Sequence, residues 1–189
     1  MIVLKLINMS KIVAIVSSPR AKGQGNAIVE KMIEVAKANG NEVETFYINK
    51  LENLTGCQAC MGCKKKGKCI RKDSLTPVLD AVAEADSLIL SAADYFGQPC
   101  AQYRMFEDRL YGFVGPDFKP TITPKKVAIV VNAGSGAGAD ACVNSISNIM
   151  TNFFKSEVIG SLIYTEADKG SFADNAEYQA IAEDLAKKL

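Results

Sequence analysis

The chain has 189 residues, a length typical of one domain that buries a substantial core. Its 22 Lys and Arg residues and 21 Asp and Glu residues leave a net charge of +1, which gives no overall attraction to nucleic acid or to an anionic membrane. Histidine is absent, which excludes Ser-His and Cys-His nucleophilic catalysis and every metal site that contains histidine.

Six cysteines without a secretory signal predict a reducing, cytoplasmic environment, in which clustered thiols act as ligands or redox groups. Residues 1–8 are apolar but much shorter than the roughly 20 residues that span a membrane. They form either an extra edge strand or a disordered extension. We therefore divide the chain into an N-terminal extension, residues 1–9, and one domain, residues 10–189.

Lys11 to Val16 form a nearly continuous apolar run, which is typical of a strand buried on both faces of a parallel sheet. A turn of small and polar residues follows, and then a helix with Ile28, Val29 and Met32 on one face. A loop between a strand and a helix N-terminus can bind an anion, because unpaired N–H groups and the helix dipole face it. The alternative is a plain strand-to-helix connection. The phosphate-binding interpretation assigns a role to Ser18, Arg20, Gln24, Gly25 and Asn26.

Four cysteines lie within thirteen residues in the pattern Cys-x2-Cys-x2-Cys-x5-Cys. Thiolates at this density repel one another and favour a bound cation or cluster. Short Cys-x2-Cys runs wrap iron-sulfur clusters, so we expect a 4Fe-4S cluster. Zinc or a redox disulfide is one alternative, and cysteines without any ligand are another. The cysteine-rich insertion covers residues 56–72, and its expected ligands are Cys57, Cys60, Cys63 and Cys69.

Further strands alternate with helices along the rest of the chain. Asp73 or Ser74 caps a helix, a later helix over residues 140–154 directs Phe153 into the core, and a final helix over residues 175–189 buries Ile181. The alternation predicts an α/β fold with a doubly wound five-stranded parallel sheet in a three-layer α/β/α sandwich. The later strands are expected at residues 42–48, 86–92, 126–131 and 158–164.

Two more loops follow expected strands and lie at the same edge as the phosphate turn. The paired aromatics of the first suit a flat apolar ligand, although such residues also pack in cores. The alternating glycines of the second allow close approach of a ligand, or form a flexible turn. One ligand with a phosphate and a flat ring would touch all three loops, and FMN is the known occupant of such sheets. Its expected contacts here are Tyr95, Phe96, Gly97, Asn132, Gly134 and Gly136.

Three stretches of residues 10 to 165 carry a resemblance to a known family: Ser17 to Arg20 with Gly25-Asn26, Tyr95 to Arg109, and the cysteine run. Together they resemble the NADPH-dependent FMN reductase family, and the cysteine spacing is similar to that of its iron-sulfur flavoproteins. The resemblance implies a flavodoxin-like fold, bound FMN, NAD(P)H as an electron donor, and homodimers or homotetramers with FMN at a subunit interface. It also implies a cluster that exchanges electrons with flavin.

Two positions depart from the family pattern. Ala27 stands where the family usually has a hydroxyl residue, so one phosphate donor is lost. Asp94 places a carboxylate beside the flavin loop, where its charge would disfavour anionic reduced flavin, or else it faces solvent.

A basic run crowds the end of the cysteine segment. It is either a solvated surface that offsets the charge of a thiolate-ligated cluster, or a docking surface for an acidic carrier of the ferredoxin type. Nucleic-acid binding is disfavoured because no base-stacking aromatics are interleaved. The run comprises Lys64, Lys65, Lys66, Lys68, Arg71 and Lys72.

We expect an FMN-dependent oxidoreductase that passes electrons between a two-electron donor or acceptor and one-electron carriers through FMN and the cluster. No side chain has to act as an acid or base, which agrees with the absence of histidine. One alternative is a cluster-free NAD(P)H-dependent FMN or quinone reductase. Another is an electron-transfer flavoprotein without catalysis of its own.

Overall fold

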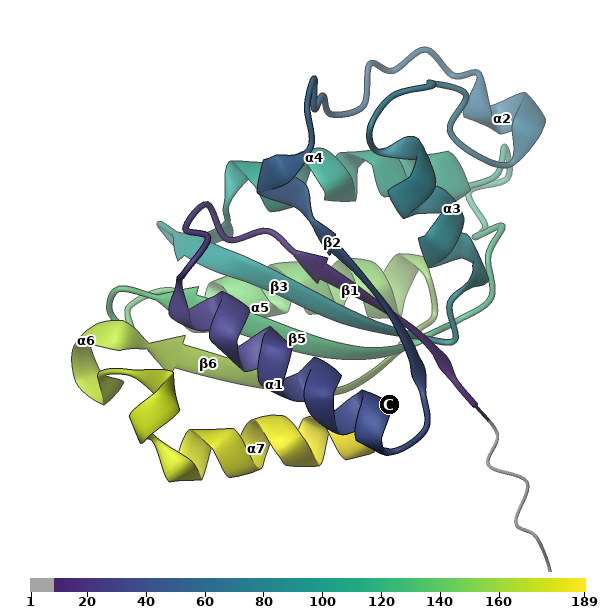
Figure 1. Ribbon diagram of the computed structural model, residues 1–189. Coiled ribbons are helices and arrows are strands. Elements are labelled where there is room, and N and C mark those ends of the chain that lie inside the picture. The colour runs from purple at the N-terminus through teal and green to yellow at the C-terminus, as the bar shows by residue number, and fades with distance from the viewer. Residues whose placement is uncertain (1–8) are drawn as a thin grey trace, which may run out of the picture.

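Five parallel strands form the centre of the structure, a computed structural model that describes residues 9–189 (Figure 1). The predicted doubly wound sheet is confirmed, and the strand at 86–92 runs three residues further than expected. The extension assigned to residues 1–9 lies outside the described residues except for Met9. The strand order is β2 (Glu42–Tyr47), β1 (Lys11–Val16), β3 (Ser87–Tyr95), β5 (Lys126–Ala133) and β6 (Glu157–Thr165).

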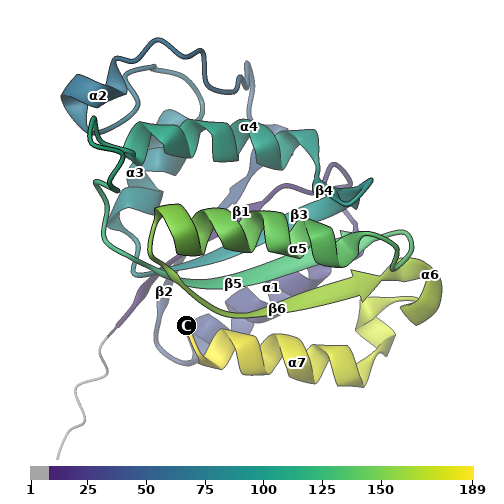
Figure 2. The same cartoon turned by 180° about the vertical axis from the view of Figure 1, so that it is seen from behind.

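Helices cover both faces of the sheet (Figures 1 and 2). The alternate residues of β1 explain why its sequence is apolar throughout. Val13 and Ile15 belong to the core on one face, whereas Ile12 and Ala14 belong to the core on the other. The first core is covered by α3 (Thr76–Glu84), α4 (Ala101–Arg109) and α5 (Ala139–Asn148), and the second by α1 (Gln24–Ala38) and α7 (Ala176–Lys187).

The position of β1 between β2 and β3 determines where a ligand can bind. Within the sheet, β2 lies next to β1 on one side and β3 lies next to β1 on the other, so the direction in which strands are added reverses at β1. Ligands of open α/β sheets bind outside the carboxyl ends of the strands at such a switch point. The loops that follow β1, β3 and β5 lie at this edge.

The helix expected over residues 140–154 changes type before its end. After α5, Ile149–Phe153 form a π-helical turn, in which the Phe154 amide donates to the Ile149 carbonyl at 3.3 Å, five residues back. The additional residue in the turn rotates the side chains that follow it about the helix axis. The prediction that Phe153 faces the core is therefore wrong: Phe153 is 54% exposed, whereas Phe154 is 3% exposed.

The two phenylalanines give a direct test of this turn. Phe154→Ala is expected to lower the free energy of unfolding by about 3 to 5 kcal/mol, the usual loss for a buried Phe. Phe153→Ala is expected to lower it by less than about 1 kcal/mol, because most of that ring is already in water. Urea unfolding of both variants measures the difference. Equal losses would contradict the π-helical turn.

The C-terminal helix α7 also differs from expectation in one residue. Asn175 caps it, and its Oδ1 atom accepts from the Tyr178 amide at 3.2 Å. Ile181 is 37% exposed, so the prediction that it is buried is wrong. Leu185 faces the core as predicted, together with Ala182 and Ala186, and these two small residues allow α7 to pack closely against α1.

Candidate functional site

The loop after β1 contacts the end of β5 at a position that requires glycine. Gly25, in the first turn of α1, is buried directly against the side chain of Asn132. A Cβ atom at residue 25 would lie 2.4 Å from Asn132 Oδ1 and 3.1 Å from its Cγ, much closer than a van der Waals contact. The structure thus brings two of the sequence-predicted residues together.

The aromatic loop after β3 is a tight β-hairpin. Asp94 pairs with Pro99 and Tyr95 with Gln98, which forms the antiparallel strand β4 (Gln98–Pro99). The two turn residues, Phe96 and Gly97, have φ angles of 57° and 76°, as a two-residue hairpin turn requires. The sequence prediction treated this segment as a loop and missed the strand.

The hairpin in turn contacts the glycine-rich loop after β5. A Cβ atom added to Gly138 would lie 3.0 Å from the Gly97 Cα atom. The loops after β1, β3 and β5 therefore meet at one edge, as the sequence predicts.

Buried polar atoms without a hydrogen-bond partner gather at the same edge. Such atoms are rare in native proteins, and each one calls for an explanation such as a bound ligand. Five of them come from the ends of β1, β3 and β5 and from the start of α1. They are Ser17 Oγ, Asn26 Oδ1, Ser91 Oγ, Asp94 Oδ1 and Asn132 Oδ1.

The cysteine-rich insertion lies beside α4 and contains the short helix α2 (Cys63–Lys66) (Figure 1). Its four cysteines line one cavity of about 20 Å³. Cys57 and Cys60 are exposed, Cys63 is buried and Cys69 is half-buried. Within residues 9–189, no three His, Cys, Asp or Glu side chains converge closely enough to hold one metal ion.

A model of a family described as NADPH-dependent FMN reductase matches residues 10–169. The chain belongs to that family.

Curated relatives narrow the placement to the iron-sulfur flavoprotein branch of the FMN reductase family. An iron-sulfur flavoprotein from Archaeoglobus fulgidus is 32% identical over 129 residues, which are 67% of this chain and 56% of that protein. One from Methanocaldococcus jannaschii is 30% identical over 139 residues, 73% of this chain and 70% of that protein. The chain thus spans little more than half the length of the first relative.

Solved structures of similar fold include flavin and quinone oxidoreductases. An NADH:FMN oxidoreductase in its apo form has a TM-score of 0.70 at 16% identity, with 95% of this chain and 88% of that chain covered. An NAD(P)H:quinone oxidoreductase from Methanothermobacter marburgensis has a TM-score of 0.66 at 14% identity, with 95% and 94% covered. At these identities the likeness shows the flavodoxin-like fold of this FMN reductase family member.

Ser18 and Asn26 shape the loop at which the family resemblance places the FMN phosphate. Ser18 Oγ accepts from the Arg20 amide at 3.3 Å, and both Ser18 and Asn26 are buried. Asn26 Nδ2 donates to the Ala21 carbonyl at 2.9 Å, whereas its Oδ1 atom has no partner. The loop is held in shape by its own side chains, and one amide oxygen remains for a ligand network.

Arg20 and Gln24 contact other parts of the chain. Arg20 forms an ion pair with Glu166 at 2.7 Å, in which the Arg20 side chain is 57% exposed and the Glu166 side chain is half-buried. Gln24 Oε1 accepts from the Phe172 amide at 2.8 Å and so fixes the segment before α7. Arg20 can leave an exposed ion pair easily, because such pairs contribute little stability. The Gln24 side chain already bonds the Phe172 amide, so its predicted phosphate contact gains no support.

The hairpin tip projects its aromatic side chains. Tyr95 is 53% exposed and Phe96 is fully exposed, in a backbone conformation that a bulky residue seldom adopts. Gly134 and Gly136 are also exposed, and a Cβ atom on Gly134 would meet nothing within 4 Å. The protein itself therefore does not require glycine at residue 134.

Asp94 lies at the base of the hairpin and is half-buried. Burial raises the pKa of its carboxyl group, and the Gly97 amide acts in the opposite direction. Its Oδ1 atom is inaccessible and has no partner. The prediction that Asp94 faces solvent therefore receives no support.

The remaining two cysteines lie in the core rather than near the insertion. Cys100 Sγ donates to the Ser17 carbonyl at 3.2 Å, and Cys142 is fully buried. Burial raises the pKa of the Cys142 thiol to about 12, so it stays protonated and is no metal ligand.

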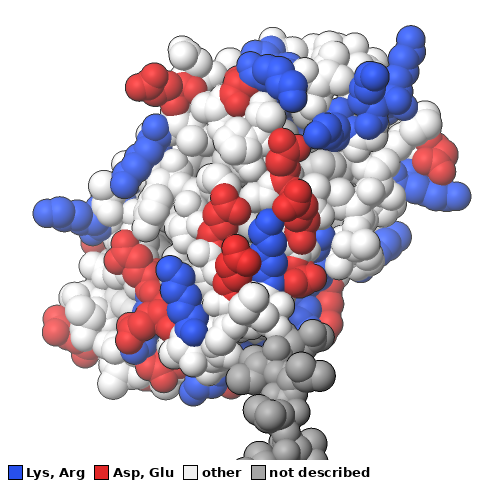
Figure 3. Space-filling view, turned by 45° about the vertical axis from the view of Figure 1, so that its right-hand side comes forward, with Lys and Arg blue, Asp and Glu red and all other residues white. Residues whose placement is uncertain are grey.

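The basic run forms a surface above the rest of the domain. Lys and Arg side chains gather at the top of Figure 3, where α2 lies in Figure 1. Lys64 packs on the Tyr111 ring with its Nζ 3.6 Å from the ring centroid, and Lys68 pairs with Asp80 at 3.3 Å. Lys65, Lys66 and Lys72 are exposed.

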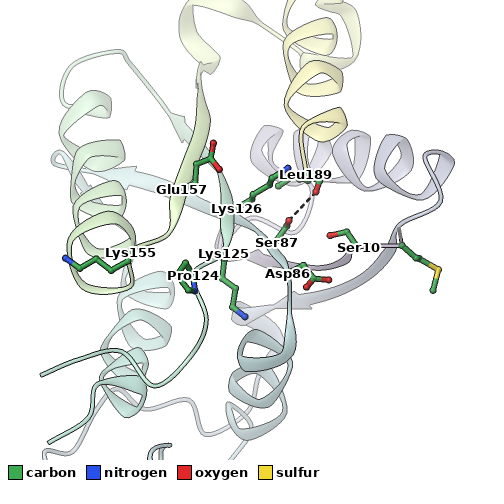
Figure 4. Close-up of a pocket in the computed structure, with 10 residues that line it drawn as sticks. Ser10, Asp86, Ser87, Pro124, Lys125, Lys126, Lys155, Glu157 and Leu189 are labelled. Atoms are coloured by element: carbon green, nitrogen blue, oxygen red, sulfur yellow. Dashed lines mark hydrogen bonds between the residues drawn. The ribbon is translucent and has the colours of Figure 1, made fainter. Parts of the chain in front are cut away.

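A hollow lies at the opposite edge of the sheet, near the amino ends of the strands (Figure 4). It measures about 550 Å³, but its lysines are already bonded within the protein. Lys125 Nζ donates to the Ala83 carbonyl at 3.0 Å, and Lys126 Nζ donates to the Lys188 carbonyl at 3.0 Å. Because α/β sheets bind ligands at the other edge, we assign no function to this hollow.

No helix of residues 9–189 has the length and apolar character to cross a membrane.

Glu107 in α4 is a buried carboxyl group that the sequence reasoning did not single out. Its side chain is 3% exposed and pairs with Arg104, and its Oε1 atom has no partner. Burial raises the pKa of Glu107 to about 7, against the opposing charge of Arg104.

Glu107 is expected to make the stability depend on pH. Between about pH 4.5 and 7 the folded chain binds more protons than the unfolded chain, so the free energy of unfolding falls as pH rises through this window. The fall is about 3 kcal/mol at most. Glu107→Gln removes it, whereas Glu177→Gln at an exposed site does not. Urea unfolding from pH 5 to pH 8 measures both, and an unchanged slope in Glu107→Gln would contradict the raised pKa of Glu107.

Proposed function

We propose that the chain is an FMN-dependent oxidoreductase that binds FMN where the loops after β1, β3 and β5 meet. The group of unpartnered buried polar atoms at this edge is the observation that carries the proposal. Ribityl hydroxyl groups could donate to the amide and carboxyl oxygens, and a phosphate could accept from a serine hydroxyl. The close packing of Gly25 on Asn132 brings the start of α1 next to the end of β5.

The side chains bind and orient the cofactor. Ser18 and the first amides of α1 hold the phosphate, Asn26 shapes the loop, and Arg20 joins them once it leaves Glu166. The Tyr95-Phe96-Gly97 hairpin and the loop from Asn132 through Gly134 and Gly136 border the ring. When bound, FMN supplies both two-electron and one-electron redox chemistry.

We also propose that Cys57, Cys60, Cys63 and Cys69 hold a 4Fe-4S cluster. Four thiols on one cavity are the donor set that such a cluster requires, and the relatives are named iron-sulfur flavoproteins. A cavity of about 20 Å³ holds little more than one water molecule, so the insertion has to open around a cluster. The cluster would link the flavin to one-electron carriers.

A specific observation favours a second candidate, a cluster-free NAD(P)H-dependent FMN or quinone reductase. The cysteines of the described chain do not converge on one point. A third possibility is a flavoprotein that only relays electrons between partners.

One preparation distinguishes these candidates. The protein is purified without oxygen, and its absorption spectrum, FMN content and iron content are measured. FMN with about four irons per chain supports the proposal, FMN without iron supports the second candidate, and a colourless protein that does not bind added FMN contradicts both. NADH and NADPH oxidation with and without an external acceptor then separates a reductase from a relay protein, which shows almost no turnover.

We further propose a cytoplasmic homodimer or homotetramer that exchanges electrons with an acidic, ferredoxin-type carrier. The exposed aromatic tip at Tyr95 and Phe96 supports cover by a second subunit, and six free thiols support a reducing compartment. Lys65, Lys66 and Lys72 supply the positive docking surface. Analytical ultracentrifugation tests the oligomer. Electron transfer that weakens as salt rises supports the docking surface, and a salt-independent rate contradicts it.

A further inference from the structure

Arg109, the last residue of α4, is the largest of the fully buried side chains. A guanidinium group keeps its charge when buried, so burial is tolerated only where partners satisfy it. Every hydrogen-bond partner of this guanidinium lies on the cysteine segment or directly beside it.

The contacts join the two ends of that segment. Arg109 Nη1 donates to the Thr55 carbonyl at 3.2 Å, two residues before Cys57. Arg109 Nε donates to Cys69 Sγ at 3.2 Å. The two Nη atoms bond both oxygens of Asp73, at 2.7 and 3.2 Å, four residues after Cys69.

Between these ends the segment has further contacts, because Thr121 Oγ1 donates to the Gly67 carbonyl at 2.9 Å and Lys64 Nζ donates to the Tyr111 carbonyl at 3.4 Å. Its only regular element is the four-residue helix α2, and Ala59 and Met61 adopt left-handed conformations that disfavour residues with a side chain. Hydrogen bonds that join the two ends reduce the conformational freedom of the whole loop. Arg109 therefore links Thr55, two residues before the first cysteine, to Cys69, the last one.

Asp73 extends the same network into the fold. The hydrogen bonds from Arg109 lower the pKa of the Asp73 carboxyl group. Its Oδ1 atom also accepts from the Leu75 amide at 3.1 Å, at the start of α3. The hydrogen-bond network of Arg109 and Asp73 thus connects the cysteine segment to two helices, α3 and α4.

We infer that Arg109 is the positioning residue of the cysteine segment: it fixes Cys69 for ligation and donates an N–H···S hydrogen bond to that ligand. The second half of this inference rests on the proposed cluster. A cationic donor on a ligand sulfur stabilises the reduced cluster, which carries one more negative charge, and so raises the reduction potential.

Arg109→Lys tests the inference, and Arg71→Lys is the matched control. Lysine keeps the charge and the number of trypsin sites but loses the fork that reaches three partners. Arg71 also pairs with Asp73, at 3.3 Å, yet its side chain is 37% exposed and bonds to no other side chain within residues 9–189. A thermal melt first establishes that both variants are folded.

The first measurement uses iron-free protein and limited digestion with trypsin, because Lys64 to Lys72 offer cleavage sites within the segment. Arg109→Lys is expected to be cut there about tenfold faster than wild type, and Arg71→Lys within about twofold of it. Equal rates in all three proteins would overturn the positioning role. If Arg109→Lys does not fold, Asp73→Asn replaces it: faster cleavage supports the inference and unchanged cleavage overturns it.

The second measurement is the midpoint potential of the cluster in iron-loaded protein. Arg109→Lys is expected to shift it to a more negative value, whereas Arg71→Lys leaves it unchanged. A purely structural role would change digestion and leave the potential where it was, which would overturn the N–H···S contribution. A chain that never holds iron would end the proposed cluster, while the digestion result would still decide the positioning role.

Discussion

Replacing Gly25 with alanine is expected to weaken FMN binding about 10- to 100-fold. The new Cβ atom would lie 2.4 Å from Asn132 Oδ1, so the Asn132 side chain has to turn away. That side chain is 4% exposed and has little room, and its displacement removes hydrogen bonds from the proposed flavin site. A lost hydrogen bond of this kind contributes about 1.5 to 3 kcal/mol where a charged group is involved. Fluorescence titration of the flavin-free protein with FMN measures the dissociation constant.

Gly40→Ala is the matched control, because Gly40 lies just beyond the C-terminal end of α1, far from the proposed flavin site. Gly40 has a φ angle of 87°, so alanine there destabilises the fold by about 1 kcal/mol. FMN affinity is expected to stay at the wild-type value. Equal affinities for wild type and Gly25→Ala would place the flavin elsewhere, and equal losses in both variants would indicate a general effect of stability.

Cys63→Ser is expected to remove nearly all iron from the protein while FMN remains. Cys63 begins α2 and is the one buried thiol of the insertion, so it is the ligand whose position the fold constrains most. Serine oxygen is a poor replacement for thiolate in a cluster that is bound by four cysteines. Iron analysis and the visible spectrum of protein prepared without oxygen measure the loss.

Cys142→Ala serves as the control for the loss of a thiol. Cys142 is buried in the core and its thiol stays protonated, so the iron content of this variant is expected to equal that of wild type. Iron retained in Cys63→Ser at the wild-type level would exclude the proposed ligand set. FMN lost together with iron would indicate that the insertion supports the flavin site directly.

The sequence was sufficient to predict the parallel sheet, because the hydrophobic pattern of a strand determines whether it is buried on both faces. The run from Lys11 to Val16 becomes a strand with the predicted bounds. The strands alternate with helices, so strand order and layers follow from few rules. The same rules place Gly25 and Asn132 at one edge, where the structure has them in contact.

Other features depend on geometry that spacing alone does not express. Phe96 adopts a positive φ angle, although a glycine or asparagine would signal such a turn more clearly, so the hairpin was missed. The π-helical turn adds one residue to a helix without any distinctive residue type. As a result Phe154 is buried in the core, where the sequence predicted Phe153. Arg109 appeared in the family motif, but its three partners lie 36 to 54 residues away in the chain.

The outer position of β2 bears on how the protein behaves at high concentration. Among residues 9–189, β2 pairs with β1 alone, so its other side offers free main-chain donors and acceptors. Glu42 and Glu44 are exposed along this strand. A second molecule that added its own β2 would bring like charges together, and natural proteins use such charges to prevent edge-to-edge aggregation. This edge of the sheet is thereby protected against pairing with a second molecule.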